Sequence, residues 1–116
     1  MKTILIAAAI LTASVTPSLA DTKPAKPSAT EMCRSIGDLA RRIMTQRQDD
    51  MPMSLLIEAV EKAAETEGQK AAGEFTRALI IAAYGEPDFE VDENREAAIA
   101  EFGNQAELVC FQAHAK

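Results

Sequence analysis

Residues 30–48 of the chain read TEMCRSIGDLARRIMTQRQ. The apolar residues of this stretch recur at spacings of three and four, which places them on one face of an amphipathic α-helix. They are Cys33, Ile36, Leu39, Ala40, Ile43 and Met44. Thr30 is a candidate N-cap, and Pro52 marks the end because proline disfavours helix in the residue before it. We therefore predict a first helix over 30–48 that buries one stripe.

Three further helical segments follow, at about 55–66, 70–84 and 93–113. Ser54 and Asp92 are candidate N-caps, and Gly68 and Gly85 are placed to end the second and third helices. The inward faces predicted for these helices comprise Leu55, Leu56, Ala59, Val60 and Ala63, then Ala72, Phe75, Leu79, Ala82 and Ala83, then Ile99, Phe102, Ala106, Val109 and Cys110. No segment alternates apolar and polar residues as a strand does. We predict an all-α bundle of about four helices, two of them short.

Residues 1–20 have the pattern of a secretory signal peptide. Lys2 gives a positive start, residues 4–11 are an unbroken apolar run, and small residues precede a cleavage point after Ala20. The run is shorter than the roughly 20 apolar residues that span a membrane. We therefore expect an exported protein, periplasmic or secreted, with no transmembrane segment after cleavage.

The stretch 21–29 holds two prolines and two lysines but no large apolar side chain. This composition predicts a flexible linker before a helical domain over 30–116. The ordered part is then only about 85 residues, so its core is modest and its stability marginal on size grounds.

Cys33 and Cys110 are the two cysteines of the chain, and both lie on predicted apolar stripes near the ends of the helical domain. In an exported chain, an even pair is most simply a disulfide. The alternative is a redox pair, but redox enzymes usually place both thiols in a C-x-x-C motif. The bond would close a loop of 78 residues, for which the loop-entropy estimate gives about 4.5 kcal/mol.

Composition and charge exclude several classes of function. The net charge of −6 argues against nucleic-acid binding, which usually needs a basic face. Aromatic residues make up only 4% of the chain, too few for a base- or sugar-stacking platform. With one histidine and two cysteines, a zinc site or a catalytic triad is hard to assemble. We expect no enzyme, no catalytic residue, no metal and no cofactor.

The charge is polarised along the chain. Residues 21–48 carry six basic and three acidic side chains, whereas residues 49–116 carry five basic and fifteen acidic ones. The first predicted helix holds four arginines, Arg34, Arg41, Arg42 and Arg47. They are a candidate surface for an acidic partner. The alternative, which we favour, is that they pair with the protein's own acidic helices.

Residues 86–93 carry five carboxylates at 86, 88, 90, 92 and 93. Alternating oxygen ligands are typical of a calcium loop, with Glu90 at position 1 and Glu101 at position 12. However, Arg95 stands at position 6, where such loops require glycine. The simpler interpretation is a solvated acidic loop that leads into a helix N-terminus, where acidic residues complement the helix dipole.

Several residues carry a resemblance to known proteins. Ile36, Asp38, Leu39, Ile43 and Arg47 follow Cys33, and Tyr84 with Pro87, Arg95, Phe102 and Glu107 precede Cys110. Together they resemble small secreted two-cysteine helical proteins of proteobacteria and their phages. The resemblance spans residues 33–111 and implies export and a helical fold, but no site. The chain is also similar in class to periplasmic acid-stress chaperones, although it lacks the tryptophan that flanks their first cysteine.

These observations favour a non-catalytic protein-binding module in the periplasm, one form of which is an inhibitor. The expected partner is a periplasmic or cell-envelope protein. The alternative is a periplasmic stress chaperone, which would expose apolar surface as its carboxylates lose their charge at low pH. A hydrolase is disfavoured because no carboxylate pair is recognisable.

Overall fold

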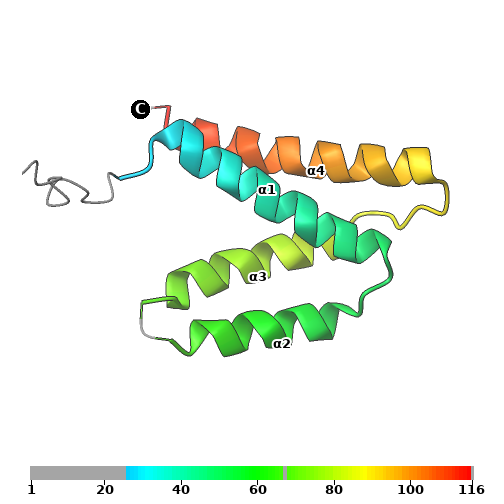
Figure 1. The fold of residues 1–116 in the computed structure, drawn as a ribbon, viewed down its shortest axis with the longest axis horizontal. Coiled ribbons are helices and arrows are strands. Elements are labelled where there is room, and N and C mark those ends of the chain that lie inside the picture. The colour runs from blue at the N-terminus through cyan, green and yellow to red at the C-terminus, as the bar shows by residue number, and fades with distance from the viewer. Residues whose placement is uncertain (1–25, 67, 116) are drawn as a thin grey trace, which may run out of the picture.

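The computed structural model describes residues 26–66 and 68–115. These residues form four helices and no strand (Figure 1): α1 (Ala29–Gln48), α2 (Met53–Ala64), α3 (Lys70–Tyr84) and α4 (Asp92–Ala113). The predicted all-α bundle with two shorter helices is confirmed. The predicted signal peptide, and the predicted linker up to residue 25, lie outside the described residues. Among the helices described, none is long and apolar enough to cross a membrane.

The first helix begins one residue earlier than predicted, because its N-cap is Ser28 and not Thr30. The Ser28 hydroxyl accepts a hydrogen bond from the Glu31 backbone N–H at 3.1 Å. The Glu31 carboxylate in turn accepts one from the Ser28 N–H at 3.2 Å. This reciprocal capping box needs a Glu or Gln three residues after the cap, which Ser28 has and Thr30 lacks. Ala29, predicted as linker, is therefore helical.

The predicted caps of the other helices are also corrected. Pro52 stands at the N-cap of α2, and Ser54 lies within the helix. Val91 precedes α4, so Asp92 is the first helical residue and complements the helix dipole there. Gly85 keeps a right-handed φ of −77°, whereas Gly68 has a φ of 86° and turns the chain between α2 and α3 as predicted.

The central helix of the fold is α1, which packs against α4 on one side and α3 on the other (Figure 1). The remaining helix, α2, packs on α3. The buried core is built from Ile43 and Met44 of α1 with Ile80 and Ala83 of α3. The stripe predicted for the first helix is thus correct at its centre, since Cys33, Ala40, Ile43 and Met44 are all buried.

The inward faces predicted for α2 and α3 are wrong in several places. No residue of α2 is buried, and Leu55 is 51% exposed, because α2 packs mainly on the single helix α3. On α3 the buried residues are Ala83, which was predicted, and Ile80, which the prediction missed, while Phe75 is 45% exposed. The other predicted inward residues that are exposed are Ala59, Ala63, Ala72, Ala82 and Val109.

Close approach of α1 and α4 depends on two glycines. A Cβ on Gly37 would lie 2.5 Å from the Glu107 side chain, and a Cβ on Gly103 would lie 2.4 Å from the Arg41 side chain. Each helix therefore has a glycine at the point where a long polar side chain of the other helix packs against it. Any larger residue at either glycine would force the opposing side chain, Glu107 or Arg41, to move.

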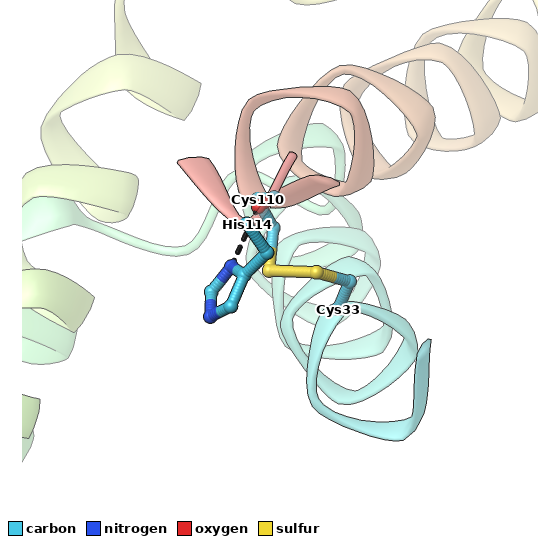
Figure 2. A group of neighbouring side chains, drawn as sticks. All are labelled: Cys33, Cys110 and His114. Carbon is cyan, nitrogen blue, oxygen red and sulfur yellow. Dashed lines mark hydrogen bonds between the residues drawn. A yellow bond between two sulfur atoms is a disulfide. The ribbon is translucent and has the colours of Figure 1, made fainter. Parts of the chain in front are cut away.

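The disulfide between Cys33 and Cys110 is confirmed (Figure 2). It joins the first turns of α1 to the last turns of α4, with the two Cα atoms 5.4 Å apart and 77 positions apart in sequence. Both cysteines are buried. The bond holds together the ends of the two helices that are farthest apart along the chain.

Candidate functional site

An open groove of about 860 Å³ lies between α3 and α4. Both helices pack on or near α1 and diverge from one another toward the end that carries the disulfide (Figure 1). Phe75 and Leu79 of α3 face Phe102 and Val109 of α4 across it, and Met44 of α1 contributes to its lining. We call this surface the α3–α4 groove.

The groove is predominantly apolar yet open to solvent. Phe75 is 45% exposed and Val109 is 65% exposed. Scattered apolar residues are normal on a protein surface, but a contiguous apolar concavity marks a binding site more often than a structural feature. Both residues were predicted to face a core, and no segment of the described chain covers them.

The polar residues of the groove are acidic or neutral. Glu86 and Glu101 lie in its lining together with Asn94 and Gln105, and His114 stands at its end. Among the described residues that line it, none is lysine or arginine. The groove therefore combines an apolar surface with two carboxylates and no basic side chain other than His114 in its described lining.

Gln48 positions the part of the groove lining that lies in the connection between α3 and α4. It was not predicted as a functional residue. Its side chain is 2% exposed. Its Nε2 donates to the Pro87 carbonyl at 2.9 Å, and its Oε1 accepts from the Phe89 N–H at 2.9 Å. Pro87 and Phe89 both line the groove, so this amide positions them. The sequence feature that could have indicated its role is its position four residues after Met44, which places a polar side chain on the buried stripe.

Further contacts secure the same end of the molecule. Arg95 of α4 donates to the Gln48 backbone carbonyl at 2.8 Å and forms an ion pair with Asp49. The Tyr84 hydroxyl donates to the Met51 carbonyl. These bonds tie the end of α1 and the residues that follow it to the last residue of α3 and to the first turns of α4.

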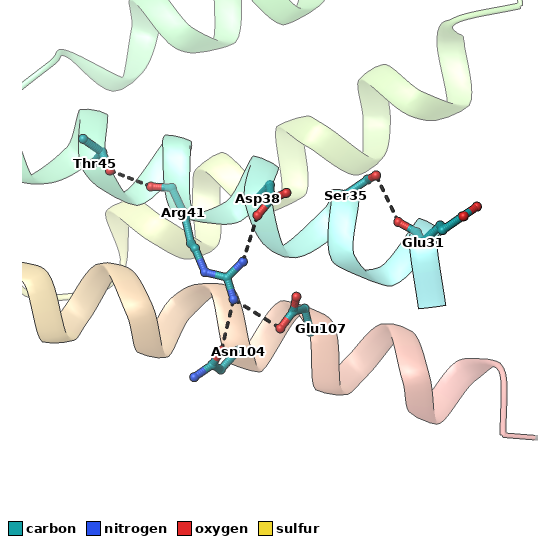
Figure 3. Close-up of polar contacts among 7 residues, drawn as sticks. All are labelled: Glu31, Ser35, Asp38, Arg41, Thr45, Asn104 and Glu107. Carbon is teal, nitrogen blue, oxygen red and sulfur yellow. Dashed lines mark hydrogen bonds and ion pairs between the residues drawn. The ribbon is translucent and has the colours of Figure 1, made fainter. Parts of the chain in front are cut away.

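The four arginines proposed as a partner surface have different positions. Arg41 donates to Asp38 at 3.1 Å, to Asn104 at 3.1 Å and to Glu107 at 3.2 Å (Figure 3). It therefore lies across the interface of α1 and α4, in contact with the protein's own acidic groups. In the part of the chain that the structure describes, no ion pair includes Arg34 or Arg42, and both are exposed.

Arg47 is also engaged within the protein. Its guanidinium donates to the Glu86 carbonyl at 3.3 Å and lies 5.2 Å from the centre of the Tyr84 ring, a distance at which a cation is attracted by the aromatic face. Two of the four arginines, Arg41 and Arg47, thus contact groups of the protein itself, and a partner surface formed by the four stays a prediction.

Cys33, Cys110 and His114 lie together, with their candidate ligand atoms within 4.8 Å of one another (Figure 2). The His114 Nδ1 is 2.8 Å from the Cys110 carbonyl oxygen, four residues back along the helix. Thiolates are the metal ligands that cysteine supplies. Because the two sulfurs are bonded to each other, this group holds no thiolate while the disulfide is intact.

The acidic stretch 86–93 is not shaped as a calcium loop. Asp92 begins α4, so Asp92 and Glu101 both lie on one helix, whereas the twelve residues of a calcium loop wrap around the ion. Just beside this stretch, a hydrogen bond with Asp88 and the negative charge of Asp88 raise the pKa of the Asp50 carboxyl above its usual value. Two carboxyl groups in contact favour the state in which one is protonated.

We compared the chain with models of known protein families, with curated proteins and with solved structures, and no match was found in any of them. The resemblance to small secreted two-cysteine helical proteins therefore stays a prediction.

Proposed function

We propose that this protein is an exported, non-catalytic binding protein that holds an apolar segment of a partner protein in the α3–α4 groove. The observation that carries the proposal is the exposure of Phe75 and Val109 within one continuous concave surface. Covering apolar area stabilises a complex by about 25 cal/mol per Å² before the costs of association are subtracted. The groove has this area available and no segment of the described chain covers it.

Export is supported by the signal-peptide pattern of residues 1–20 and by the disulfide, since disulfides persist in oxidising compartments. Binding without catalysis is supported by the composition of the groove, which offers two carboxylates and amides among apolar side chains. The partner that fits this location is a periplasmic or cell-envelope protein.

Site-specific photo-crosslinking tests the proposal. A photo-reactive residue is placed at Val109 in the groove, and in a matched protein at Leu55, which is similarly exposed but lies on α2. In periplasmic extract, we expect one crosslinked partner from the Val109 position, lost when Phe75→Asn is added. Equal labelling from Leu55, or no labelling from Val109, would overturn the proposal.

A stress chaperone is the second candidate, favoured by the large apolar side chains that are exposed outside the groove. They include Leu55, Ile81, Val91 and Leu108. A chaperone would suppress aggregation of many unfolded proteins, with a gain at pH 2–3 where acid states expose apolar surface. Aggregation assays that show no gain at this pH would exclude this candidate and leave the specific binding protein.

A further inference from the structure

We infer that the occupant of the α3–α4 groove is a cationic amphipathic helix of the partner protein. The inference rests on the proposed function and specifies the chemistry of the segment that the groove receives. Three properties of the groove carry it, namely the helical nature of its walls, its length and the sign of its charge.

The helical walls favour a helical occupant over an extended one. The backbone N–H and C=O groups of α3 and α4 are hydrogen-bonded within their own helices. An extended peptide would therefore find no backbone partners along an apolar surface, and unpaired buried polar groups are costly. A helix satisfies its own backbone groups and presents a stripe of side chains at i, i+3, i+4 and i+7 to a groove.

The length of the groove matches several helical turns. Its lining on α4 extends from Asn94 to Ala113, which at 1.5 Å per residue is about 28 Å. A helix of roughly 18 residues would lie along this wall, with α3 on its other side. The disulfide between Cys33 and Cys110 holds the far end of α4 on α1, so the wall is fixed before the partner arrives.

The charge of the groove selects a cationic occupant. Glu86 and Glu101 lie in the lining, and the described lining residues include no lysine or arginine that could pair with an anion. The surrounding chain from residue 49 onward adds a strong excess of acidic groups. An acyl chain with a carboxylate head would thus be repelled, whereas lysines or arginines beside an apolar stripe would be attracted.

The same argument disfavours a second copy of this chain as the occupant. One helix that a second copy could offer is α2, which shows no buried residue and exposes Met53 and Leu55. In addition, α2 and its C-cap carry Glu58, Glu61 and Glu65 against a single Lys62. Docking α2 of another copy would bring these carboxylates toward Glu86 and Glu101, which is unfavourable.

The test uses two synthetic helical peptides of 18 residues with identical leucine and alanine stripes. One carries lysine on both flanks of the stripe and the other carries glutamate. Binding of each labelled peptide to the disulfide-bonded full chain is measured by fluorescence anisotropy. We expect the lysine peptide to bind at least about tenfold more tightly, because two favourable charge contacts replace two repulsive ones.

Matched variants locate the binding. Val109→Asn is expected to weaken binding of the lysine peptide about tenfold, because it removes a large apolar contact. Leu55→Asn on α2 should leave the binding affinity unchanged. Glu101→Gln is expected to weaken binding of the lysine peptide by about threefold, which is the contribution of one partly exposed charge pair. Circular dichroism should show that the bound peptide is helical.

Each contrary result has a defined meaning. If both peptides bind equally and Val109→Asn weakens both, the groove is a protein-binding site without charge selection, so the inference fails and the proposed function stands. If the lysine peptide binds regardless of Val109→Asn, it lies elsewhere on the acidic surface and the inference fails. Dimerisation in light scattering that Val109→Asn abolishes would assign the groove to a second copy and overturn the inference.

Discussion

Removing the side-chain amide of Gln48 should destabilise the protein strongly, although the change removes no large apolar side chain from the core. Gln48→Ala deletes one hydrogen bond to the Pro87 carbonyl and one from the Phe89 N–H, each 2.9 Å long. A hydrogen bond contributes about 1 kcal/mol net, and a buried group left without its partner costs about 1–3 kcal/mol. We therefore expect a loss of about 2–4 kcal/mol in the free energy of unfolding.

Urea denaturation followed by circular dichroism measures this loss, which corresponds to a fall of roughly 2 M in the midpoint for a domain of this size. The matched control is Gln46→Ala, because Gln46 lies on the same turn of α1 and its side chain makes no hydrogen bond among the described residues. Surface substitutions of this kind change stability by about 0.5 kcal/mol or less. Equal losses in the two variants would refute the reasoning.

A second substitution at the same position adds a dependence on pH. In Gln48→Glu the carboxylate still accepts from the Phe89 N–H but cannot donate to the Pro87 carbonyl. Burial raises the pKa of the introduced carboxyl, and its protonated form regains the donor. The deficit of this variant relative to the native protein should therefore shrink as the pH falls, and a constant deficit would show that the two hydrogen bonds are not its cause.

Three further predictions concern other parts of the fold. Reduction of the disulfide should lower the free energy of unfolding by up to about 4.5 kcal/mol, measured by urea denaturation with and without a phosphine reductant. Gly103→Ala should lower it by about 1–3 kcal/mol in the same assay, because the new Cβ would lie 2.4 Å from the side chain of Arg41. Asp50→Asn should raise the melting temperature at pH 7, and the gain should shrink as the pH falls. The raised pKa of Asp50 means that the folded protein holds its proton more tightly, and this stabilisation disappears as the pH rises through the folded-state pKa.

The number of helices, their approximate ends and the disulfide could all be predicted from local signals. The stripe that includes Cys33, Ile43 and Met44 has helical spacing, and proline and glycine mark the connections. The N-cap residues could not be assigned from the sequence, because several nearby residues compete for the N-cap position of each helix. Ser28 replaced Thr30 because the reciprocal bond with Glu31 decides between them.

The groove could not be predicted, because the spacing of apolar residues in the sequence is the same whether or not another helix covers them. Phe75 and Val109 lie among apolar residues at helical spacing, as Ile43 and Met44 do, yet they remain exposed. Whether α3 and α4 close on one another depends on how α1 lies between them, which is a property of long-range packing. The hydrogen bonds of Gln48 to the connection before α4 are likewise set by contacts 39 and 41 positions apart in sequence.

The bond between Cys33 and Cys110 also determines how the domain responds to mechanical force. The first described residues and the last ones leave the domain at the same end, where the bond lies (Figure 1). Tension applied through the two ends of the chain would pass from one cysteine to the other across the sulfur atoms. The residues between the two cysteines would carry none of this tension, so pulling with optical tweezers should unfold none of them until the bond is reduced.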